Sequence, residues 1–269
     1  LISVPDNVPN PGPGNIQNRR PYPQWGQFYM GETNGNANYN AAQVTLEKRF
    51  SSGYQALVSY TWSKCIDEGS NQSAPITVSL LAANRAVCDF NSPQNLTVSS
   101  VYELPFGRQR RFLSDANGFV DAVIGGWELA GILTARSGLP FTPTISSDIA
   151  NTGVSSQRPN LVGDPNVSNP TVQAWFNPGA FAAPAQYTYG NSGRNILTSD
   201  GLLQLDMTLK KNFPIMESHQ LEFRAEAFNI ANHPTFSTPN ATIGSSSAGI
   251  VTSTLNANRI LQLALKFYF

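Results

Sequence analysis

Two cysteines are the residues of this sequence best suited to covalent chemistry. Cys65 and Cys88 fall in one predicted loop, where an oxidising compartment would join them in a disulfide; two unpaired thiols are the alternative. In the chain-entropy model, closing a loop of this length contributes about 3 kcal/mol to stability. His219 and His233 lie far from both cysteines in the sequence, so a metal site would lack ligands. We therefore expect a disulfide, no metal site, and surface or structural roles for the two histidines.

The remaining polar residues do not indicate acid–base or phosphate chemistry. Asp206 and Glu222 carry carboxylates, but both fall on the polar side of an alternating pattern, where a wall of hydrated charges explains them better than general acid–base catalysis. The glycine-rich segment 190–194 follows no predicted strand and opens no predicted helix, so it is not expected to hold a phosphate. The sequence thus predicts no catalytic residue and no cofactor, and we do not expect an enzyme.

A group of aromatic residues in the longest predicted loop is the candidate for a binding surface. If that loop is exposed, these side chains could form a surface for a ligand or a protein partner. The alternative is that they pack the loop against itself. The residues are Trp175, Phe176, Phe181, Tyr187 and Tyr189.

Composition limits the elements that can position these residues. Charged residues are 13% of the chain, and 17 basic side chains balance 17 acidic ones, so there is no electrostatic footprint for nucleic acid. The sequence has no apolar run of about eighteen residues, which excludes a transmembrane helix. Frequent glycine and proline favour short strands and loops over helices.

The clearest pattern is a period-two alternation in the last twelve residues. From Leu261 onward every second residue is large and apolar, which predicts a β-strand with one apolar and one polar face. A strand of an outer-membrane barrel turns its apolar face to lipid and its polar face to a watery lumen. At about 3.3 Å per residue and a tilt of about 40°, this segment spans roughly 30 Å, enough to cross the membrane. The apolar residues are Leu261, Leu263, Leu265, Phe267 and Phe269.

Six further segments share this alternation and are predicted as strands. Their polar sides carry neighbouring opposite charges, such as Glu47 with Arg49, and Arg224 with Glu222 and Glu226. In a dry core these charges would each cost several kcal/mol unless paired, whereas in a watery lumen they cost little. We therefore favour a barrel over the alternative of a secreted, soluble β-sandwich. The predicted strands are residues 42–50, 54–63, 95–104, 126–136, 201–213 and 219–231.

The predicted connections alternate between short and long, as in outer-membrane barrels. Residues 1–38 are expected to be irregular, with one possible short strand at 25–30, and a short helix is possible at 119–124. The sequence thus predicts an all-β fold, an antiparallel up-and-down transmembrane β-barrel segment of seven or eight strands with long extracellular loops. The short connections are 51–53, 105–125 and 214–218, and the long ones are 64–93, 138–200 and 232–257.

With these strands assigned, the sequence resembles the C-terminal barrel of Oar-like TonB-dependent receptors, which are large outer-membrane proteins with a carboxypeptidase-regulatory-like domain at the N-terminus. The matching stretches occur in the same order over nearly the whole chain, which makes the resemblance specific although no single motif is. They are 38–43 (NYNAAQ), 46–50 (LEKRF), 59–64 (SYTWSK), 102–107 (YELPFG), 125–127 (GGW), 137–141 (SGLPF), 190–195 (GNSGRN), 224–229 (RAEAFN) and the pair His233-Pro234.

The resemblance implies a barrel of about 22 strands with a plug domain in its lumen and energy coupling through TonB. Residues 1–269 would be the C-terminal part of such a receptor, with a loop-like stretch at 1–38 and barrel strands and loops at 39–269. The sequence begins at Leu1, without an initiator methionine or a signal-peptide pattern. We therefore expect it to be part of a longer polypeptide; removal of a leader by processing is the alternative.

The expected function is ligand uptake across the outer membrane, and the alternative is a structural or adhesive surface protein that displays long loops. The ligand is not readable from the sequence. The expected partners are outer-membrane lipid, the TonB system through other regions of the receptor, and the barrel assembly machinery, which would read the apolar positions that end at Phe269.

Overall fold

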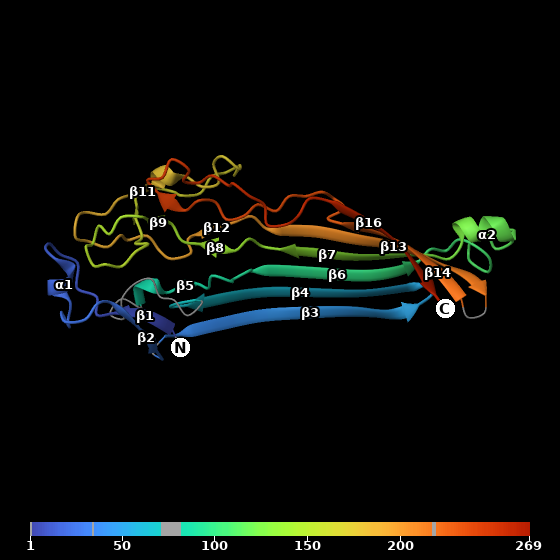
Figure 1. Ribbon diagram of the computed structural model, residues 1–269, viewed down its shortest axis with the longest axis horizontal. Helices are drawn as coiled ribbons and strands as arrows, with labels where there is room; N and C mark the ends of the chain where they lie inside the picture. The colour runs from blue at the N-terminus through green and yellow to red at the C-terminus, as the bar shows by residue number, and fades with distance from the viewer. Residues whose placement is uncertain (1, 34, 71–81, 217–218) are drawn as a thin grey trace.

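In the computed structural model, which describes residues 2–33, 35–70, 82–216 and 219–269, seven long strands form one antiparallel sheet (Figure 1). Each long strand pairs with the next long strand along the chain, so the sheet is an up-and-down meander. The two-residue strand β5 (Ala86–Val87) adds a short pairing to β4. The long strands are β3 (Ala37–Ser51), β4 (Tyr54–Asp67), β6 (Gln94–Glu103), β7 (Trp127–Arg136), β13 (Leu202–Met216), β14 (His219–Phe228) and β16 (Ile260–Tyr268).

The pairing register brings the predicted apolar rows onto one side of the sheet, the apolar face. One rung across five strands joins Leu46, Val58, Val98, Leu133 and Leu205, each directly opposite the next. Because side chains alternate between the faces of a strand, the rows between these residues lie together on the other side, the polar face.

The apolar face carries no second layer of structure among the described residues. Leu46 is 64% exposed and Leu263 is 73% exposed, although both lie within strands. The sheet is also open, because β3 and β16 form its two edges and pair with no strand on their outer sides in the described chain. A soluble β-sandwich would bury this face against another sheet, so the sandwich alternative is not supported.

Short connections meet at one end of the sheet, the turn end, and long loops meet at the other, the loop end (Figure 1). Ser52 and Gly53 both have positive φ, 54° and 77°, as expected for the two-residue hairpin turn between β3 and β4. The connection from β6 to β7 contains α2 (Gly118–Ile124), where the sequence predicted a short helix. No helix in the described part of the chain is long and apolar enough to cross a membrane.

The loop end contains a small hydrophobic core of its own. Trp175 and Ile196 pack against its edge. Short ladders tie this region together: β8 (Pro140–Phe141) with β12 (Leu197–Thr198), β9 (Thr144–Ile145) with β15 (Thr242–Ile243), and β10 (Asn160–Leu161) with β11 (Phe181–Ala182), beside the 3-10 helix η2 (Pro178–Ala180). The buried residues of this core are Phe141, Phe176, Ala180, Phe181 and Leu197.

Residues 1–38 are more regular than the sequence predicted. β1 (Ile2–Asp6) pairs with β2 (Phe28–Glu32), which overlaps the short strand predicted at 25–30, and α1 (Ile16–Arg19) lies between them. The buried Asn7 holds this hairpin closed, because its amide nitrogen donates to three backbone carbonyl groups between residues 22 and 26. Such a contact leaves no periodic signal in the sequence.

Candidate functional site

A ladder of ion pairs crosses the polar face near the turn end. Lys210 Nζ lies 2.9 Å from Glu128 Oε1 on the neighbouring strand. On β14, Arg224 contacts both Glu222, at 2.9 Å, and Glu226, at 3.4 Å. These side chains are partly to largely buried, and each charge forms an ion pair with an opposite charge on the sheet itself. Because opposite charges are paired, the polar face can border water or a polar filling of the lumen without producing a strong electrostatic potential of one sign.

Asp206 has a structural role further along the polar face, beside the point where β14 ends. Its Oδ1 accepts a hydrogen bond from the backbone N–H of Asn229 at 2.8 Å, and both carboxylate oxygens accept from Gln204. Asn229 has a φ of 48°, and β14 ends just before it, at Phe228, rather than at residue 231 as predicted. The carboxylate thus fixes the point where the chain leaves the sheet.

A disulfide joins Cys65 to Cys88, with their Cα atoms 5.4 Å apart. The sequence placed both cysteines in a loop, but Cys65 lies within β4, which extends beyond its predicted end at residue 63. Cys88 is fully buried, and its backbone N–H donates to the Cys65 carbonyl at 3.2 Å. The bridge therefore fastens the long loop after β4 directly to the sheet. Among the described residues, no three His, Cys, Asp or Glu side chains group as a metal site would require.

Arg194 connects two long loops and was missed by the sequence analysis. Its guanidinium is 4% exposed, and it binds Asp67 Oδ1 and, at 2.8 Å, Asp89 Oδ1. It also donates to Ser70 Oγ at 3.2 Å and to the Asn84 carbonyl at 3.0 Å. The glycine-rich segment 190–194 thus positions an arginine that ties the longest loop to the disulfide-bonded loop.

Arg158 lies buried close to this cluster. It donates from Nη2 to the Ala83 carbonyl at 3.2 Å. Burial, and secondarily the positive charge of Arg194, lower the pKa of the Arg158 guanidinium. The two arginines bring together loops that are distant in sequence, so the loop end is a folded assembly rather than a set of separate loops.

The five aromatic residues considered as a possible binding surface do not form one exposed surface. Phe176 and Phe181 are 2% and 6% exposed, and their rings pack edge to face in the loop core. Trp175 packs against that core and donates from Nε1 to the Thr198 carbonyl at 2.9 Å. Tyr187 is exposed, while Tyr189 is half-buried and burial raises the pKa of its hydroxyl. These aromatic residues mainly pack the longest loop against itself.

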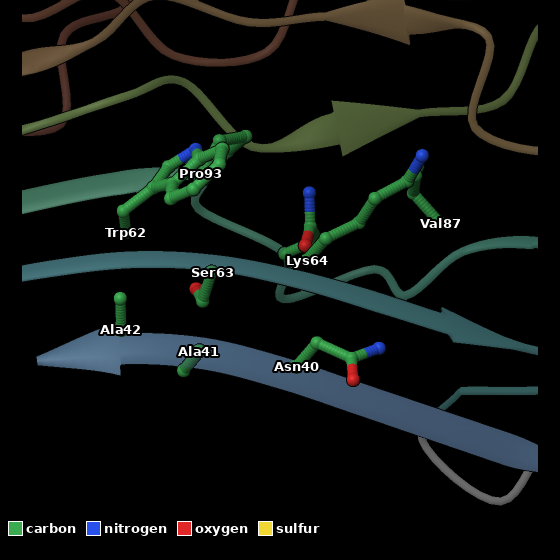
Figure 2. Close-up of a pocket in the computed structure, with 9 residues that line it drawn as sticks. Asn40, Ala41, Ala42, Trp62, Ser63, Lys64, Val87 and Pro93 are labelled. Carbon is green, nitrogen blue, oxygen red and sulfur yellow. The ribbon is translucent and has the colours of Figure 1, made fainter.

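A pocket of about 560 Å³ lies beside the disulfide at the loop end. Figure 2 shows Trp62 with Pro93 at one end of it and Lys64 with Val87 at the other. Trp62 and Lys64 follow Val58 at even spacing on β4, so these side chains share the apolar face. Part of the pocket lining is thus formed by side chains on the outside of the sheet.

The terminal strand carries its apolar residues in one row opposite β14. Leu265 faces Phe223, and Phe267 faces Leu221. Phe269 lies just beyond β16, is 93% exposed, and stacks on Phe267 with ring centroids 6.2 Å apart. The five positions predicted as an assembly signal thus lie along the edge strand β16 and just beyond its last residue.

One family model, described as an outer membrane beta barrel domain, matches residues 2–262. No curated protein and no solved structure gave a significant match.

Proposed function

The chain belongs to the family of outer membrane beta barrel domains and is located in the outer membrane. We propose that it forms part of the barrel wall of a TonB-dependent receptor that takes up an unidentified ligand. The single observation that carries this proposal is an open transmembrane sheet whose polar face bears a partnered ladder of charges.

The open sheet supports a larger barrel. An unpaired strand edge in hydrocarbon leaves N–H and C=O groups without partners, at several kcal/mol each. Both β3 and β16 have such an edge in the described chain, so each needs a partner strand in the closed barrel. A barrel of about eight strands has an interior just wide enough to be filled by side chains, whereas transporters of about 22 strands enclose a plugged lumen. A wall with the Glu222–Arg224–Glu226 cluster suits the wider, hydrated interior.

The stretches that resemble Oar-like receptors occupy structurally important positions. The segment 224–229 supplies Arg224 and Glu226 of the charge ladder and Asn229 at the end of β14. The segment 190–195 supplies Arg194. The resemblance therefore includes the wall and the loop assembly, and this supports a receptor of the same kind.

The loop assembly is also compatible with a second candidate, an adhesive or structural surface protein. The disulfide, Arg194 and the loop core hold the long loops in one shape, as a surface protein that displays its loops would require. A receptor also needs shaped extracellular loops to bind its ligand, so this feature alone does not separate the two candidates.

Uptake by intact cells tests the proposal. Depletion of compounds from a defined medium would be followed by mass spectrometry in cells with the intact gene, in a deletion strain and in a strain without TonB. We expect at least one compound whose uptake is lost in both mutants and restored when the gene is returned. Unchanged uptake in the deletion strain, together with loss of attachment to surfaces, would contradict transport and favour the adhesive alternative.

A further inference from the structure

A lysine interrupts the apolar face near its turn end. Lys211 follows Leu209 in the outward row of β13, and the register places it opposite Trp127 on one side and Phe223 on the other. The residue is only 3% exposed. A charged side chain that faces hydrocarbon raises the free energy of the folded protein unless it has polar partners, so we expect polar groups to cover Lys211.

The last turn of α2 covers this lysine. Lys211 Nζ donates to the carbonyl oxygens of Gly125 and, at 3.3 Å, of Asp121. The indole Nε1 of Trp127, also on the apolar face, donates to the Val123 carbonyl at 2.9 Å. A cation at the C-terminus of a helix is favoured because the last carbonyl groups point towards it. Two side chains of the apolar face thus hold α2 on the outside of the wall and not beneath the lumen.

The connector around α2, residues 105–126, is folded rather than extended. The Arg108 backbone N–H donates to Asp121 Oδ1 at 2.6 Å, and the rings of Phe106 and Phe112 lie 5.6 Å apart. Gly107 has a φ of 113°, and a Cβ there would lie 2.7 Å from the Gly125 Cα, so only glycine allows this approach. The shape of the connector is therefore set by contacts within the chain.

The outer surface of this connector is apolar and basic. Phe119 is 80% exposed, Val123 54% and Ile124 41%. Phe119 and Val123 are four residues apart, so they share one side of the helix. Arg108 and Arg111 are exposed in the same connector. Figure 1 shows α2 at the turn end, beyond the ends of β6 and β7.

We propose that residues 105–126 form an interfacial anchor that binds phospholipid in the inner leaflet of the outer membrane. Short connections of these barrels lie on the periplasmic side, which places α2 at the inner leaflet. Phe119, Val123 and Ile124 enter the boundary between headgroups and acyl chains, to a depth of roughly 5–10 Å. Arg108 and Arg111 contact the lipid phosphates. The inference rests on the membrane location of the barrel and is independent of ligand uptake.

Fluorescence quenching in vesicles tests this anchor. The full-length protein carrying Phe119→Cys would be labelled with the dye NBD, because the described native cysteines are paired in a disulfide and leave the new thiol as the reactive one. Val123→Cys provides a second position, and Asp115→Cys, at an exposed polar residue of the same connector, is the matched control. The vesicles contain phosphatidylethanolamine and phosphatidylglycerol, with a nitroxide quencher on the acyl chain of a tracer lipid.

We expect blue-shifted emission and several-fold stronger quenching at positions 119 and 123 than at position 115. Lys211→Met in the Phe119→Cys protein should reduce the quenching, because it removes the contact that holds α2 on the apolar face. Equal quenching at all three positions would overturn the proposal and would favour a periplasmic protein, in place of lipid, as the group that covers the apolar surface. Unchanged quenching after Lys211→Met would overturn the positioning role of the lysine.

Discussion

Replacing Leu205 by arginine tests which face of the sheet meets lipid. Leu205 lies in the rung that passes through Leu133 and Val98, near the middle of β6, so the new charge would stand deep in the apolar layer. Arginine at such a depth costs about 2–4 kcal/mol, which lowers the ratio of folded to unfolded protein by about 30- to 900-fold. Gln204, the preceding residue, faces the other way and donates to Asp206 at 3.0 Å. Gln204→Arg therefore places a cation beside a carboxylate and should change stability little.

The assay is urea-dependent folding into phospholipid vesicles, followed by tryptophan fluorescence and by heat-modifiable mobility in gels. Val58→Arg and Leu263→Arg should behave like Leu205→Arg, because both belong to apolar rows. Gln262→Arg provides a second control on the polar face, opposite Glu226. Equal losses of stability on the two faces would refute the assignment of one face to lipid and the other to water.

Three further predictions concern the loops and the last residue. Peptide maps of the envelope-localised protein should contain a Cys65–Cys88 cross-link that disappears on reduction; free alkylation of both thiols without reductant would contradict it. Arg194→Ala should cost about 3–5 kcal/mol, because it leaves the Asp67 carboxylate buried without its cation, and limited proteolysis should then cleave the long loops faster. Cleavage at the rate of the unaltered protein would show that the arginine does not hold the loops. Deleting Phe269 from the full-length protein should sharply reduce its level in the outer membrane, since this residue would end the signal read by the assembly machinery; wild-type levels would leave only the role of an interfacial anchor.

The strands were predictable because alternation is a local signal. Each long strand combines a row for lipid with a row for water, so its side-chain period is visible without knowledge of its neighbours. The ends were less accurate. β3 begins at Ala37 and β4 reaches Asp67, several residues beyond their predicted limits. In these extensions, residues 37–41 and 64–67, the rows of large apolar side chains are interrupted by polar residues, so the pattern that marks a strand is broken there.

The loop assembly was not predictable because its contacts join distant parts of the chain. Arg194 meets Asp67 across 127 residues, and neither residue stands out in its own segment. The burial of Phe176 and Phe181 likewise depends on packing between loops. Lys211 differs from these cases, since a lysine in the row that contains Leu209 breaks the alternation and is visible in the sequence. That break could have indicated a polar cover on the lipid side.

Electron cryomicroscopy of the full-length protein in lipid nanodiscs would show directly which face of the sheet meets lipid and whether the sheet is part of a closed barrel. We expect a closed barrel in which strands β3 to β16 keep their order and both outer edges are paired. Val58 and Leu205 should contact lipid, and Arg224 should face the lumen. A map in which Arg224 faces lipid, or in which a second layer of protein covers the Val58 row, would contradict this expectation.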